Sequence, residues 1–484
     1  MGLTRHDPAR TSFRALDDAG LRLPVQLSFN KVGDTARYPW FKLTSMVKCL
    51  EELDRVNLLL PAQSWEQSQE MLGTYWARFR SQYPTHEVFG LLTMEELQMA
   101  LPIKLHGDEG KKKSPLMLLS WQPVLGRGTS KSVQQPLEVQ NAAQKLNLLG
   151  SLLLTRWLLF AALKETYSEC PSALDDAMAM VLEDLNFACH TGVAVNLFGQ
   201  SRRLRFVAVS VKGDWPFLIE AAHLERHFRR APKRERSDMC SNLGVCHLCL
   251  GGYQGIPYED FAEVPQWEQT MQSAAAMVPW HSESPWHSLP SLPSFRPWTF
   301  RPDIFHNFHL GHGRYFVSSA LEWLEDWLTD DMVAELSQQD RRVAFIALGV
   351  QSMNAALRLL YRGGAWLAAA DSASIAFFGL EHLRAYKKLA QLSIDAREPR
   401  FPIHCKAHML NHTFRFLELW AQQVEWVENP LADSCQIDES FVGVISRFSR
   451  RVSPRMTILR TYDLYVTALR DRVHQGHDDA SVLE

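Results

Sequence analysis

The spacing of apolar residues predicts helices at the start of the chain and a hairpin after them. From about residue 40 to 100 the apolar positions recur at helical intervals, so region 1–98 is expected to be helical. The run LPIKLHGDEG then predicts a strand that ends at Asp108 and Gly110. A basic turn follows, and LMLLSWQPVLG predicts the second strand of the hairpin.

The next apolar segments add a strand and a helix to this hairpin. Leu152 to Lys164 fits a third strand or a helix, because periodicity does not separate the two in so apolar a run. Helical spacing predicts a helix over 172–188. LRFVAVSVKGD is a β-branched strand that ends at Asp214, and the helix-like WPFLIEAAHL follows it. The resulting order is strand, carboxylate, helix.

The second half of the chain follows a different pattern. Residues 255–302 are rich in Pro, Trp and Ser, which excludes regular helix and predicts an ordered, irregular connection. Beyond it, amphipathic helices are predicted over 314–337, 340–361, 381–396 and 404–428. The sequence thus predicts a mixed α/β fold: a core in 99–254, a helical insertion in 303–430, and a final segment, 431–484, that returns to the core.

Composition and charge fit a folded protein with a local nucleic-acid surface at most. The 484 residues are 46% apolar and carry a net charge of −3, which argues against a protein that coats DNA with its whole surface. Basic runs occur at Lys111–Lys113, Arg226–Arg236, and Arg447, Arg450, Arg451 and Arg455. Each alone is more often a solvated surface.

No segment predicts a membrane span or a leader. The most apolar stretch, Leu146–Leu163, contains Asn147 and Arg156. We therefore expect a soluble, intracellular protein without a membrane partner. The 8 cysteines, two of them in a C-x-x-C, favour a reducing compartment with metal binding over a disulfide framework.

Three acidic residues stand where a two-metal site needs them. Phosphodiester cleavage by two metal ions requires carboxylates from separate elements to converge, because the ions lie about 3.5–4 Å apart. A ribonuclease-H-like fold supplies an Asp on its first strand, an Asp after its fourth strand, and an acid on a late helix. Asp108, Asp214 and Glu439 follow this order. For any one of them a capping or surface role is the more frequent explanation.

A second set of residues has the spacing of a zinc site. Cys246 and Cys249 form the C-x-x-C, and His408 and His412 lie four apart, on one face of a predicted helix. Together they predict a structural zinc that joins the helical block to the core. Buried thiols and surface histidines are the simpler explanation for each pair alone. Rival ligands stand beside both pairs: Cys240, His247, His404 and Cys405.

A third cluster lies in DIFHNFHLGHGR. Its three histidines recur every third residue and begin close to Asp303; they are His306, His309 and His312. Such a cluster can bind metal, but a hydrogen-bonded polar loop is the more common outcome.

Taken together, these motifs resemble the CACTA and Plavaka DDE transposases. The resemblance covers about residues 100–455 and depends on order and spacing: a carboxylate after a strand, an Asp in G-D-x-P, the C-x-x-C, D-x-x-H, H-x-x-x-H and a final acid. The recombination-activating recombinase of vertebrate immunity is similar in the order of its carboxylates, cysteine pair, histidine pair and Glu. Relatives usually carry a separate DNA-binding domain, and no helix-turn-helix or finger is evident before Asp108.

The resemblance implies a ribonuclease-H-like core, metal-dependent DNA cleavage and strand transfer. It implies that Asp108, Asp214 and Glu439 hold Mg²⁺ or Mn²⁺, with Asp438 an alternative to Glu439 and Asp303 a rival for the second position. It further implies that zinc is held by Cys246, Cys249, His408 and His412.

By the same resemblance, the partners would be the transposon ends and the target DNA, and the protein would act in the nucleus. A homodimer is compatible with it. A catalytically inactive, zinc-stabilised binding remnant of a transposase is the alternative. An unrelated zinc-stabilised helical protein, in which the acids are merely caps, is a third.

Overall fold

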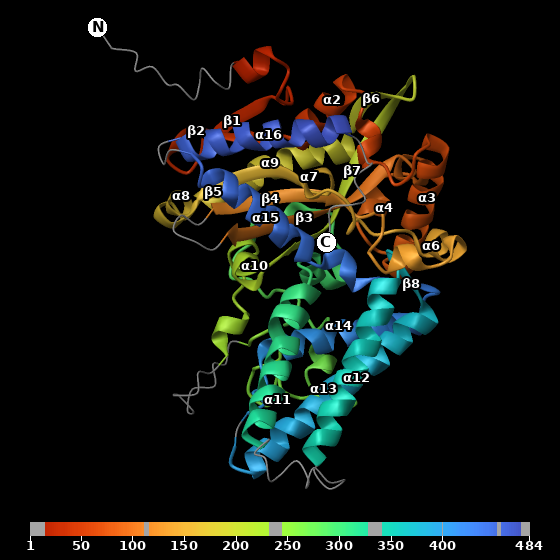
Figure 1. Cartoon of the computed structure of the whole chain (residues 1–484), viewed down its shortest axis with the longest axis vertical. Coiled ribbons are helices and arrows are strands. Elements are labelled where there is room, and N and C mark those ends of the chain that lie inside the picture. Colours follow the sequence, from red (N-terminus) through yellow and green to blue (C-terminus); the bar gives the residue numbers. More distant parts are fainter. Residues whose placement is uncertain are drawn as a thin grey trace.

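A curled sheet with helices on both sides organises the protein (Figure 1). The computed structural model describes residues 15–110, 116–231, 244–327, 341–398, 400–452 and 456–475. The fold is mixed α/β, as predicted. Lys111–Lys113, Arg455, Cys240 and the end of the Arg226–Arg236 run lie outside the described residues.

Five strands form the central sheet in the order β5-β4-β3-β7-β6. β3 (Ala100–Gly110) pairs antiparallel with β4 (Leu116–Pro123), which pairs antiparallel with β5 (Trp157–Leu163). On its other side β3 pairs parallel with β7 (Gln200–Gly213), and β6 (Val193–Leu197) pairs antiparallel with β7. The predicted hairpin is confirmed, with Asp108 on its first strand. Segment 152–164, for which both a strand and a helix were possible, contains one of each: the short helix α7 (Leu152–Thr155) and strand β5.

A bulge sets which side chains of β7 face the same side of the sheet as Asp108. The register runs from Ile103 opposite Ala208 to Lys104 opposite Ser210, so β7 has one extra residue there. This shift reverses the inside-outside alternation of β7. As a result Ser210 and Lys212 share a face with Lys104, His106 and Asp108.

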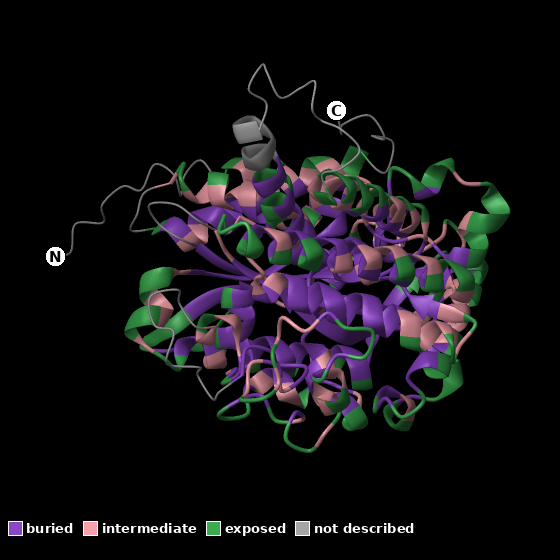
Figure 2. Ribbon diagram, turned by 90° about the horizontal axis from the view of Figure 1, so that it is seen from below, coloured by how far each residue is buried: buried purple, intermediate pink, exposed green. Residues whose placement is uncertain are grey.

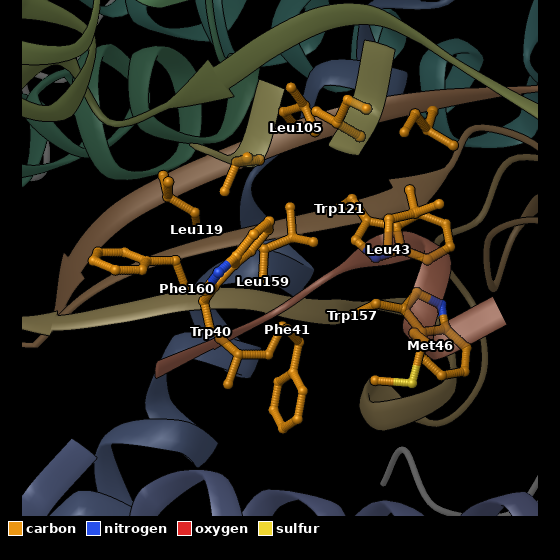
Figure 3. Packing of buried hydrophobic residues seen from close by; sticks show 14 of the residues in the cluster. Trp40, Phe41, Leu43, Met46, Leu105, Leu119, Trp121, Trp157, Leu159 and Phe160 are labelled. Atoms are coloured by element: carbon orange, nitrogen blue, oxygen red, sulfur yellow. The ribbon is translucent and has the colours of Figure 1, made fainter. Parts of the chain in front are cut away.

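The opposite face of the sheet carries the larger apolar core. It packs against α9 (Ala173–His190), as predicted over 172–188, and against α2 (Leu43–Glu52) and α16 (Thr457–Gln475). Figure 3 shows the aromatic centre of this core, where Trp121 and Trp157 stack with ring centroids 5.9 Å apart. Buried residues accordingly run through the middle of the molecule in Figure 2.

Tyrosine hydroxyls cover the edge strand β5. Tyr465 accepts a hydrogen bond from the Leu158 amide, Tyr462 accepts one from the Ala161 amide, and Tyr38 donates to the Ala161 carbonyl. An edge strand without such partners is open to pairing with another chain. Tyr38 belongs to a hairpin, β1 (Leu27–Val32) and β2 (Thr35–Phe41), that the helical prediction for region 1–98 did not include.

Helices and short segments complete the first half of the chain. The predicted irregular connection over 255–302 is confirmed, with 3-10 turns as its only helical elements among the described residues. The strand-carboxylate-helix order is confirmed by α10 (Trp215–Ala221) directly after Asp214. The other helices of this half are α3 (Trp65–Gln82), α4 (Val88–Leu91), α5 (Met94–Leu97), α6 (Leu137–Ala143) and α8 (Lys164–Glu169).

The predicted helical block lies on the polar face of the sheet. It consists of α11 (Gly313–Trp327), α12 (Arg341–Arg362), α13 (Ala369–Asp395) and α14 (Cys405–Ala421). The prediction of helix to residue 428 was wrong, because Trp426–Glu428 forms strand β9 and pairs with β8 (Trp366–Ala368). Among the described helices, α12 alone is long and apolar enough to cross a membrane. This is weak evidence for a membrane span, because core helices of soluble proteins can be equally long and apolar.

Buried ion pairs join the polar face of the sheet to the segment that precedes and begins α15 (Gln436–Ser449). The Lys104 ammonium donates to Glu428 at 3.0 Å and to Asp433 at 2.5 Å. The Lys212 ammonium donates to Asp438 at 2.7 Å, and Arg156 donates to the same carboxylate at 3.2 Å. All six side chains are at most 6% exposed, so each charge depends on its partners for solvation.

We predict that Lys104→Met strongly destabilises the protein, because it leaves Glu428 and Asp433 with less compensation for their charge. The expected loss of unfolding free energy is about 3–5 kcal/mol. The matched control is Lys48→Met, whose exposed pair with Glu51 is worth at most about 1 kcal/mol. Denaturation in urea measures both, and equal small losses would show that the buried pairs contribute no net stability.

We also predict that this cluster makes stability fall in acid. Burial alone would raise the pKa of Glu428, but Lys104 and Arg301 lower it to about 2, below the unfolded value of about 4.3. A lowered folded-state pKa contributes stability above the unfolded pKa and loses it as pH falls towards the folded value. Unfolding free energy should therefore decline between about pH 5 and pH 2, less steeply in Lys104→Met; a parallel decline in both proteins would exclude Lys104 as the cause.

Candidate functional site

Asp108 and Asp214 lie side by side at one edge of the sheet. They follow Gly107 and Gly213, which are paired in the parallel register of β3 and β7. Both glycines are needed there: a Cβ on Gly107 would lie 2.0 Å from the Phe217 ring, and one on Gly213 would lie 2.4 Å from the Gly107 carbonyl oxygen. Asp214 also caps α10, since its Oδ1 accepts the Phe217 amide at 2.8 Å.

Glu439 completes the group from the first turn of α15. Its carboxyl shares a hydrogen bond with Asp108, and α15 crosses the end of β3, where Ser446 lies against Gly110. The structure therefore brings together the three carboxyls that the sequence singled out, from two strand ends and one helix start. We call Asp108, Asp214 and Glu439 the carboxylate pocket.

The acids of the carboxylate pocket shift one another's pKa values. Burial, then the hydrogen bond and charge of Glu439, then the charge of Asp214 raise the pKa of Asp108 to about 9. Burial would also raise the pKa of Glu439, but its hydrogen bonds with His306 and Asp108 lower it to about 2. At neutral pH Asp108 is therefore protonated and donates to the ionised Glu439. Oxygen ligands gathered in this way suit a hard divalent cation, which neutralises the same charge.

His306 and Asp303 stand directly behind Glu439. His306 Nε2 lies 3.1 Å from Glu439 Oε1, and His306 Nδ1 contacts Asp303 Oδ2. Burial would lower the pKa of His306, but the hydrogen bonds with these two acids raise it to about 10. The D-x-x-H spacing was visible in the sequence, yet contact with Glu439 was not predicted.

Two alternatives for the acids do not fit the geometry. Asp438 is fully buried and paired with Lys212 and Arg156, which lower its pKa against the effect of burial. It anchors α15 and is directed away from Glu439's partners. Asp303 is also fully buried and accepts the amides of Phe305 and Cys435, so it supports the pocket from behind.

The remaining histidines of that cluster lie elsewhere. His306, His309 and His312 belong to a π-helix, η7 (Phe305–His312), and do not gather around one point. His312 packs instead against His382 and Tyr386. The predicted alternative, a polar, hydrogen-bonded loop, is wrong for this segment too, because it forms a π-helix and neither ring nitrogen of His312 has a hydrogen-bond partner among the described residues.

Cys246, Cys249, His408 and His412 meet in a second, fully buried cluster. Their ligand atoms all lie within 4.8 Å of one another. The two Nε2 atoms are 3.1 Å apart, and each lies 3.3 Å from Cys249 Sγ. Ligand atoms around a tetrahedral zinc lie about 3.3–3.8 Å apart, given bonds of about 2.0–2.3 Å. The cluster can therefore hold one metal ion such as zinc.

Neighbouring groups orient these ligands as in a metal site. His408 Nδ1 lies 3.0 Å from the Tyr258 carbonyl oxygen, which fixes Nε2 towards the cluster. The amides of Leu248 and Gly251 donate to the two sulfurs at 3.3 and 3.2 Å. Among the rivals, His247 is turned to the Phe300 carbonyl, and His404 and Cys405 lie outside the group of four.

The cluster of Cys246, Cys249, His408 and His412, hereafter the metal cluster, is linked to the carboxylate pocket by hydrophobic packing. Trp215, the first residue of α10 after Asp214, packs in one apolar cluster with Cys246, Cys249 and Met409 of α14. A metal ion at the four ligands would thus fix the helical block against the helix that Asp214 caps.

We predict that Cys246→Ser removes a metal ion from the protein, because a thiolate ligand is lost. Metal analysis of the purified chain should give about one zinc per molecule, and markedly less in the variant. Cys405→Ser, a buried thiol in the same apolar cluster, is the control and should keep its zinc. Unchanged zinc in Cys246→Ser, or loss in the control, would refute this ligand set.

No protein-family model matches the chain, and no curated protein matches it significantly. Its function is therefore inferred from the residues and their geometry.

Proposed function

We propose that the chain is a transposon-derived DDE transposase, in which the carboxylate pocket binds Mg²⁺ or Mn²⁺ for cleavage and transfer of DNA strands. One observation carries the proposal: three acids spread over more than three hundred residues of sequence lie close enough to interact, where Glu439 shares a hydrogen bond with the buried Asp108 and the charge of Asp214 acts on Asp108. Like charges are costly to gather without a function that uses them.

The topology supports a ribonuclease-H-like core. Three antiparallel strands are followed by a long helix and by β7, which lies parallel to the first strand, with acids near the ends of β3 and β7. One departure is the antiparallel β6, which pairs with the first part of β7; near the end of β7, Phe300 bridges Val211 in parallel.

The residues of the carboxylate pocket fit divalent cations by number and type. Asp108, Asp214 and Glu439 offer carboxylate oxygens, the ligands that Mg²⁺ and Mn²⁺ prefer. Bound there, such ions activate an oxygen nucleophile and stabilise the charge that develops on the phosphate. The protein supplies no nucleophile of its own in this scheme: β3, β7 and α15 hold the carboxylates in position, and His306 holds Glu439.

Basic residues of α15 provide a local surface for DNA. Ser446 lies against Gly110 at the end of β3. Arg447 is the next residue, Arg450 follows Ser446 by one helical turn, and both arginines are exposed. Arg451 extends this group, and Arg229 and Arg230 follow α10. Positive charge beside the pocket suits a phosphate backbone, although the whole chain carries a net charge of −3.

We propose zinc as the ion of the Cys246, Cys249, His408 and His412 cluster, since two thiolates and two imidazoles in tetrahedral spacing select it. Its place is structural: it fixes α14 against the core. The same fold with an idle carboxylate pocket would be a DNA- or protein-binding remnant, and activity distinguishes the two.

We predict that the chain nicks supercoiled plasmid DNA with Mn²⁺ and that Asp108→Asn lowers the rate at least about 100-fold, because a metal-binding carboxylate is lost. Asp371→Asn, an exposed acid of α13, is the matched control and should nick like the parent protein. Nicking of equal rate by the parent and Asp108→Asn would refute the assignment. No nicking by either, from folded and zinc-loaded protein, would favour the inactive remnant.

A further inference from the structure

His306 bridges two acids that come from different parts of the chain. Nε2 faces Glu439 at 3.1 Å, and Nδ1 faces Asp303, three residues earlier on the same segment. The imidazole is only 13% exposed, so little water competes for either nitrogen. A histidine held between two carboxylates has a fixed ring orientation and a fixed direction for both N–H groups.

Asp303 is in turn anchored to the helix that carries Glu439. Its Oδ1 accepts the Phe305 amide at 2.8 Å and the Cys435 amide at 3.0 Å, and Cys435 is the N-cap residue of α15. Its Oδ2 accepts the His306 amide at 3.0 Å in addition to the ring. One short segment thus holds both the start of α15 and the side chain of Glu439.

Asp303 and His306 are arranged to support a metal ligand, Glu439, and are poorly placed to bind a metal ion themselves. Asp303, His306 and Cys435 place ligand atoms within 4.8 Å of one another. However, both oxygens of Asp303 already accept N–H donors, and both ring nitrogens of His306 face carboxylates. A metal ion among these three would have to break those contacts.

We propose that Asp303 and His306 are positioning residues that fix the orientation of the Glu439 carboxylate for metal binding in the carboxylate pocket. The inference rests on the proposed function and adds to it a device outside the three acids. Groups that orient metal ligands from behind typically contribute about 10–100-fold to metal affinity or activity. Without the pair, Glu439 is free to turn about its side-chain bonds, and binding must first restrict it again.

The test is calorimetric titration of the zinc-loaded full-length chain with Mn²⁺. We expect His306→Gln to raise the Kd about 10–100-fold. Asp303→Asn should act in the same direction, because its amide N–H₂ cannot accept from His306. His309→Gln, three residues along the same π-helix, should bind as the parent does.

A second readout separates positioning from a general loss of structure. Plasmid nicking by His306→Gln should recover as the Mn²⁺ concentration rises, because the metal ligands themselves remain. Nicking by Glu439→Gln should not recover. Zinc content and the far-ultraviolet circular dichroism spectrum identify any variant that fails to fold, and Asp303→Asn then carries the test.

The outcomes separate the two proposals. Equal Mn²⁺ affinity in the parent protein and Asp108→Asn overturns the carboxylate pocket itself. Weaker binding by Asp108→Asn with unchanged binding by His306→Gln and Asp303→Asn overturns the positioning pair alone. Weakening by Cys435→Ser as large as that by His306→Gln also overturns it, because the ion would then lie among Asp303, His306 and Cys435.

Discussion

The buried pairing of Lys212 with Asp438 is the contact on which the candidate site depends. The contact joins the end of strand β7 to the first turn of α15 at 2.7 Å, and the lysine side chain is not exposed to water. Asp214 follows Lys212 by two residues and Glu439 follows Asp438 by one, so the same contact brings two of the three acids together. Lys104, Glu428 and Asp433 extend the clamp along β3 towards the helical block.

The adjacent acids Asp438 and Glu439, at the start of α15, therefore have different roles. Asp438 faces the cations of the sheet and is held ionised, while Glu439, one residue on, faces Asp108 and His306. Successive residues of a helix differ in direction by about 100°, which is enough to separate them. A metal ion held by the two cysteines and two histidines would stabilise the same arrangement from a distance, because the apolar surroundings of these ligands include Trp215 at the start of α10.

The local parts of this site were predictable from the sequence, and the long-range parts were not. Strand periodicity and Gly-Asp endings marked Asp108 and Asp214, and C-x-x-C with H-x-x-x-H marked the metal cluster. Nothing local distinguishes Asp438 from Glu439, or tells that Lys104 and Lys212 are buried with acids more than two hundred residues away. The β1–β2 hairpin was missed for a similar reason, since its strand state depends on packing against β5. The contact of His306 with Glu439 follows from tertiary structure alone.

If the carboxylate pocket is a divalent-cation site, as we propose, Mn²⁺ should occupy it. The most direct measurement is anomalous diffraction from crystals of the zinc-loaded chain soaked in Mn²⁺. We predict manganese density among Asp108, Asp214 and Glu439, at about 2.0–2.3 Å from their oxygens, and a separate zinc peak at the cysteines and histidines. Manganese absent from the pocket at saturating concentration, with Asp108 and Glu439 still hydrogen-bonded to each other, would contradict the proposal.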